Sequence, residues 1–65
     1  MTTILLDHNE LQALTNKTAI AEDRLAEYIE AGKPAAVVRI AQRRVDALQA
    51  EMNAQDVAIR EFYGE

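Results

Sequence analysis

Gly32 and Pro34 are separated only by Lys33 near the middle of the sequence, and no other glycine or proline occurs before Gly64. The segments on either side are rich in Ala, Glu, Gln, Leu and Arg, which favour helix formation. Glycine readily adopts the left-handed conformation that ends a helix, and proline suits the start of the next one. A connection this short makes two helices antiparallel neighbours. We therefore predict an all-α antiparallel two-helix hairpin spanning residues 1–65, with a helix over about 8–31, a turn over 32–34 and a helix over about 35–62.

The start of the first predicted helix has two candidate caps. Asp7 followed by Glu10 matches the capping-box pattern, in which each side chain accepts a hydrogen bond from the backbone N–H of the other residue. Thr3 is the weaker alternative, and a start there would add a turn of helix through Leu6.

The second predicted helix carries a heptad pattern that is typical of a coiled coil. Its apolar positions are Val38, Ala41, Val45, Leu48, Met52, Ile59 and Phe62, and Gln55 is the one polar residue among them. The first predicted helix matches the pattern more weakly, through Leu11, Leu14, Thr18, Ala21, Leu25 and Tyr28. Folding the hairpin at the turn places Leu14 near Met52 and Leu11 near Gln55, and it places Leu6 or Ile4 near Ile59 and Phe62.

A second apolar stripe lies away from this seam on the same helix. It consists of Ile40, Ala47, Ala50, Ala54 and Val57, and Ile20 lies on a comparable flank of the first predicted helix. The alanines have an alternative explanation, because alanine is a good helix former that is favoured at exposed helical positions. Helix propensity does not explain the β-branched Ile40 and Val57. We therefore predict a contact surface, either for a second copy in a dimeric four-helix bundle or for a larger partner protein.

The sequence offers few groups for catalysis or metal binding. Cysteine and serine are absent, His8 is the single histidine, and no Glu-x-x-His pattern occurs. Glu27 and Glu30 are spaced to share a cation, although an acidic run is more often a solvated face. We expect no enzyme activity, no cofactor and no resident metal.

Positive charge is concentrated near the predicted turn, although the net charge of the chain is −4. This basic band consists of Lys33, Arg39, Arg43 and Arg44. In a hairpin it comes close to Glu22, Glu27 and Glu30, and we favour neutralisation by these acids. The alternative is contact with a phosphate backbone or another anion, because Arg39 and Arg43 are one helical turn apart.

The location expected by default is the cytoplasm. No run of about 18 apolar residues is present, so we expect no membrane span. The first residues also lack the basic start of a signal peptide.

Three functional hypotheses follow from these features. The first is a non-catalytic protein–protein interaction module, an assembly factor, adaptor or inhibitor, of the kind frequent among phage and plasmid accessory proteins. The second is a dimeric RNA- or DNA-binding regulator that uses the basic band, and its plan is similar to that of plasmid regulators of the repressor-of-primer type, with no shared motif. The third is an acidic inhibitor that mimics nucleic acid, because the chain has 11 Asp and Glu residues.

Overall fold

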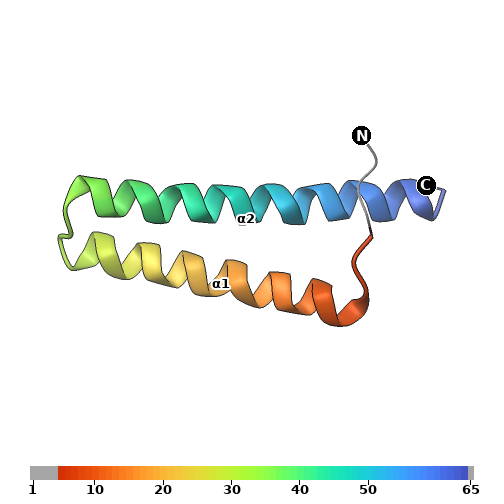
Figure 1. Ribbon diagram of the computed structural model, residues 1–65, viewed down its shortest axis with the longest axis horizontal. Coiled ribbons are helices and arrows are strands. Elements are labelled where there is room, and N and C mark those ends of the chain that lie inside the picture. The colour runs from red at the N-terminus through yellow and green to blue at the C-terminus, as the bar shows by residue number, and fades with distance from the viewer. Residues whose placement is uncertain (1–4, 65) are drawn as a thin grey trace.

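The computed structural model describes residues 5–64 of the chain, and these form two helices packed side by side. Helix α1 spans His8–Glu30 and helix α2 spans Ala35–Phe62. They run antiparallel and are joined by a tight turn at one end of an elongated molecule (Figure 1). No strand occurs within the described residues. The predicted all-α pair of packed helices is confirmed.

Helix α1 begins at the capping box that the sequence indicates. The backbone N–H of Glu10 donates to Asp7 Oδ1 at 2.8 Å, and the backbone N–H of Asp7 donates to Glu10 Oε1 at 3.3 Å. These bonds satisfy two donors that would otherwise lack partners at the helix start. Leu5 and Leu6 precede the helix in non-helical conformation, so the alternative start at Thr3 is wrong, and Thr3 itself lies outside the described residues.

The turn between the helices is built around Gly32, whose φ of +69° is in the left-handed region. The N–H of Lys33 donates to the carbonyl oxygen of Tyr28 at 3.0 Å, and the N–H of Gly32 donates to the carbonyl oxygen of Ile29 at 3.1 Å. This pair of bonds is the Schellman motif, which satisfies carbonyls at the end of α1. Pro34 then precedes α2, which begins without a side-chain cap.

The interface between the helices follows the predicted heptad seam. Five of its side chains are buried, namely Leu14, Thr18, Ala21, Val45 and Gln55. Most of the other seam positions are half-buried: Leu11, Leu25, Tyr28, Val38, Ala41, Leu48, Met52 and Ile59. Two of the five buried residues are polar and one is alanine, so the apolar core of the hairpin is thin.

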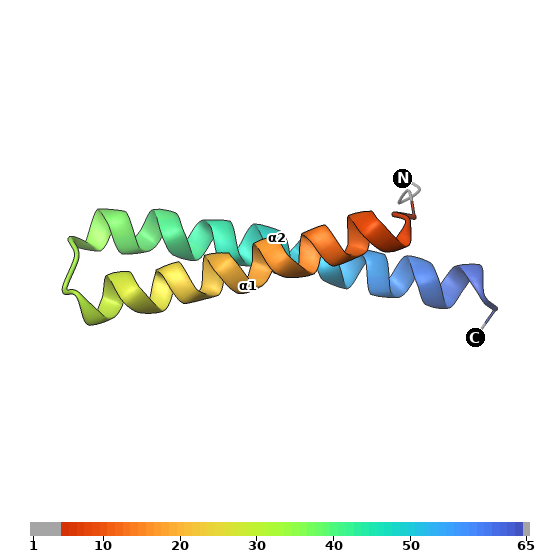
Figure 2. The same cartoon turned by 90° about the horizontal axis from the view of Figure 1, so that it is seen from below.

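The seam prediction is wrong at Phe62, whose side chain is 69% exposed. Helix α1 begins only at His8, so α2 extends past it at the end that carries Phe62 (Figure 2). No part of α1 therefore faces Phe62, which instead contacts its neighbour Tyr63 edge to face, with ring centroids 5.1 Å apart. The other proposed neighbour, Ile4, lies outside the described residues.

Candidate interaction surface

The side of α2 that faces away from α1 carries the second apolar stripe, and we call Ile40, Ala47, Ala50, Ala54 and Val57 the outer face. Each member follows a seam residue by two or five positions, which is about 200° or 140° around a helix. The side chain of Ile40 is 67% exposed and that of Val57 is 51% exposed. Ala47 and Ala50 are exposed as well. The hairpin therefore leaves these four residues of the outer face uncovered.

Ala54 differs from the other alanines of the outer face because it is half-buried. At the same level of α2, the backbone N–H of Leu6 donates a 3.0 Å hydrogen bond to Gln55 Oε1. Leu5, Leu6 and Ala58 are half-buried too. The chain that enters α1 thus reaches α2 near one end of the outer face, and the freely accessible part is centred on Ala47 and Ala50.

A groove of about 250 Å³ adjoins the outer face on one flank, near the turn. Its lining residues are Ala21, Arg24, Tyr28, Val37, Ile40, Ala41 and Arg44, and we call it the Tyr28 groove. Ile40 belongs to both surfaces, so the outer face continues into the groove. Ile20 is also exposed, but it does not line this groove.

Sequence reasoning missed two residues of the Tyr28 groove, Arg24 and Val37, and it assigned Tyr28 only to the seam. One signal for Val37 is present in the sequence, because it precedes Arg44 by seven residues and so occupies the same edge of α2. The sequence carries no such signal for Arg24, because its place in the groove depends on how the two helices face each other.

The structure divides the basic band between different surfaces. Lys33 and Arg39 line a separate groove of about 550 Å³ together with Ile29, Ala35, Val38 and Gln42. Arg44 lines the Tyr28 groove instead, and Arg43 lines neither of these two grooves.

The acidic residues near the turn do not neutralise the basic band directly. Within residues 5–64, no ion pair joins Lys33, Arg39, Arg43 or Arg44 to Glu22, Glu27 or Glu30. Neutralisation of the band by these acids at longer range stays a prediction. The long charged side chains at this end of the hairpin extend into solvent, where a fixed ion pair gains little.

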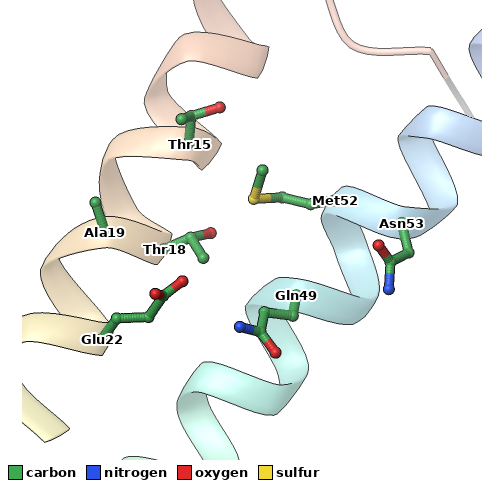
Figure 3. Close-up of a pocket in the computed structure, with 7 residues that line it drawn as sticks. All are labelled: Thr15, Thr18, Ala19, Glu22, Gln49, Met52 and Asn53. Carbon is green, nitrogen blue, oxygen red and sulfur yellow. The ribbon is translucent and has the colours of Figure 1, made fainter. Parts of the chain in front are cut away.

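The opposite flank of the hairpin carries a polar groove of about 430 Å³. Figure 3 shows Met52 pointing from α2 toward Thr15 and Thr18 of α1, with Glu22, Gln49 and Asn53 around the opening. The hydroxyls of Thr15 and Thr18 donate to the carbonyls of Leu11 and Leu14, at 3.0 and 2.8 Å. These hydroxyls are engaged in the backbone of α1, and the groove contains no histidine to activate them.

Metal-binding clusters and membrane-spanning helices are absent from the described part of the chain. Residues 5–64 contain no cluster of three His, Cys, Asp or Glu side chains suited to a metal ion. None of their helices is long and apolar enough to cross a membrane.

Comparison of the chain with protein-family models, curated proteins and solved structures finds no match. The outer face and the Tyr28 groove are therefore the best-defined candidates for a functional surface.

Proposed function

We propose that this protein is a non-catalytic protein–protein interaction module that binds its partner through the outer face of α2. The observation that carries the proposal is the exposure of Ile40 and Val57 on the side of α2 opposite the seam. Fully burying an exposed side chain of this size contributes about 1.5–3 kcal/mol, and Ile40 and Val57 each keep more than half of their surface available for burial. Ala47 and Ala50 lie between Ile40 and Val57, and their small side chains allow another helix to approach closely.

The thin core of the hairpin supports the same proposal. A two-helix chain of 65 residues buries little apolar surface by itself, and chains of this size often gain stability by associating. The partner is then another protein: a second copy that completes a four-helix assembly, or a larger protein for which the hairpin is an assembly factor, adaptor or inhibitor.

Substitutions on the outer face test this function. We would introduce Ile40→Glu and Ala50→Glu separately, with Gln49→Glu as the matched control, because Gln49 is exposed on the polar flank of the same helix. Circular dichroism would first verify that helicity is kept. Solution mass, and the proteins retained by the immobilised chain, would then report self-association and binding of other proteins.

The proposal predicts that both outer-face variants lose association while the control keeps it. We avoid Ala54→Glu because Ala54 is half-buried in the hairpin, so that loss of folding and loss of binding would be confused. Unchanged association in folded Ile40→Glu and Ala50→Glu proteins would overturn the proposal, as would the absence of any association by the wild-type chain.

A second candidate function is nucleic-acid binding through the basic band. The specific observation in its favour is that Lys33 and Arg39 share a groove and form no ion pair within residues 5–64. Binding through phosphates weakens steeply with salt, so this function predicts RNA or DNA binding at low salt that fails for a Lys33→Ala, Arg39→Ala variant. Arg60→Ala is the control at the far end of α2. No binding at low salt would exclude this candidate.

A further inference from the structure

We propose that the partner of the outer face is a second copy of this chain, bound with α2 antiparallel to α2. This inference rests on the proposed function and specifies its partner. Ile40 precedes Ala47 by seven residues, and Val57 follows Ala50 by seven. When Ala47 of one copy lies against Ala50 of the other, Ile40 of each copy therefore meets Val57 of the other. The outer face is self-complementary in this antiparallel register.

Small and large side chains lie at complementary positions in this register. The small Ala47 and Ala50 at the centre let the two backbones approach closely, and the larger Ile40 and Val57 fill the space at both ends. The remaining layer places Arg43 beside Ala54 of the second copy. Arginine can lay its aliphatic stem over such a small side chain while the guanidinium stays in water.

Charge complementarity selects the same register. Arg44 and Glu51 are seven residues apart on one edge of α2, and both are exposed. Antiparallel helices bring identical edges together, so Arg44 of each copy lies beside Glu51 of the other. Neither residue forms an ion pair within residues 5–64, so both are available for this contact.

The charges also distinguish the antiparallel arrangement from a parallel one. Parallel packing of two outer faces brings Arg39 near Arg44 of the second copy, and Asp46 near Glu51, and both pairs repel. In the antiparallel register the second edge places Asp46 beside the neutral Asn53. Its one unfavourable pairing, Arg39 with Arg60, occurs once at each solvated end of the contact, where salt screens it.

The Tyr28 groove fits this contact as well. Ile40 and Arg44 belong to the α2 wall of the groove, and Val57, Ala58 and Glu51 of the second copy would lie beside that wall. The outer face points away from α1, so the four helices form an open layer in the order α1, α2, α2, α1. This order differs from a closed four-helix bundle, in which both helices of each hairpin contact the other copy.

A charge-swap experiment tests the register. Arg44→Glu alone and Glu51→Arg alone each replace two attractive pairs with two repulsive ones, so each variant should raise the dimer dissociation constant by on the order of tenfold or more. An equimolar mixture of the two variants restores both attractive pairs and should form a 1:1 dimer. The doubly substituted chain should self-associate like the wild type. Dimers of equal affinity in all four samples would overturn the register.

Single cysteines provide a second, geometric test, because the natural chain contains none. Ile40→Cys and Val57→Cys proteins should form a disulfide with each other when mixed and oxidised, and neither should cross-link with itself. A self-linked Ile40→Cys protein would indicate a parallel arrangement and overturn the inference.

Failure of this inference can be told from failure of the proposed function. A folded monomeric wild-type chain that still captures another protein through Ile40 and Ala50 would overturn the second copy as partner and leave the proposed function standing. Association that persists in folded Ile40→Glu and Ala50→Glu proteins would overturn both.

Discussion

The backbone N–H of Leu6 donates a 3.0 Å hydrogen bond to the side-chain oxygen of Gln55, 49 residues away in the sequence. Gln55 is only 7% exposed and occupies the one polar position in the heptad pattern of α2. Its amide thus ties the segment that enters α1 to the end of α2. A polar residue at a seam position can fix the register of packed helices, and Gln55 has the location for that role.

Replacing Gln55 with leucine should destabilise the hairpin although it makes the seam more apolar. The Leu6 N–H loses its partner in a partly buried position, so we expect the free energy of unfolding to fall by about 1–2 kcal/mol. Urea denaturation measures this change. Gln49→Leu, at an exposed position of α2, is the control and should change stability little. A Gln55→Leu protein more stable than the wild type would show that the hydrogen bond stabilises the hairpin less than burial of the leucine side chain does.

Replacing Thr18 with an apolar residue, unlike replacing Gln55, should not lower the free energy of unfolding. Its hydroxyl is buried and donates at 2.8 Å to the carbonyl of Leu14, one turn earlier in α1. That carbonyl also accepts the helical bond, so Thr18→Val leaves no backbone group without a partner. The added methyl group should leave the free energy of unfolding unchanged or raise it by up to about 1 kcal/mol.

Thr18→Ser is the matched comparison, because it keeps the hydroxyl and removes the methyl group. It should lower the free energy of unfolding by about 1 kcal/mol. The reverse order, with serine tolerated and valine destabilising, would mean that the Thr18 hydroxyl has a structural role beyond its bond to Leu14.

Gly32→Ala should weaken the turn. A side chain at φ = +69° costs about 1–2 kcal/mol, because Cβ approaches the following carbonyl oxygen. Gly64 has a similar φ of +74° but lies near the end of the chain, so Gly64→Ala should leave global stability almost unchanged. Thermal unfolding of the two variants at equal concentration compares them. A loss for Gly32→Ala as small as that for Gly64→Ala would argue that the side chain at position 32 causes no net backbone strain.

Phe62→Ala should have little effect on the fold, whereas Leu14→Ala should be severe. Leu14 is buried in the seam, and such truncations typically cost about 2–5 kcal/mol, whereas Phe62 is 69% exposed. Chemical denaturation of the two variants measures the contrast. A loss at Phe62 comparable to that at Leu14 would show that the end of α2 is covered in solution.

The fold follows closely from local sequence signals. The Asp7 and Glu10 pattern fixes the start of α1, Gly32 fixes its end, and the heptads select the residues that meet in the seam. Each of these signals depends on residues near one another in the chain, or on a regular helical repeat, so it can be evaluated without coordinates.

The features that sequence reasoning missed depend on relations between the helices. Phe62 is exposed because α1 starts too late to face it, which is a consequence of the offset between two helix ends. The Tyr28 groove requires Arg24 of α1 to lie beside Val37 and Arg44 of α2. The absence of ion pairs around the basic band, within residues 5–64, depends on side-chain conformations, which a helical repeat does not specify.

The solution mass of the protein tests association through the outer face most directly. Light scattering over a dilution series should give twice the chain mass of 7.3 kDa for the wild type and for Gln49→Glu, down to low micromolar concentration. Ile40→Glu should give 7.3 kDa with its helicity intact. A wild-type mass of 7.3 kDa throughout the series, or an Ile40→Glu protein that remains dimeric, would contradict the association of two copies through this surface.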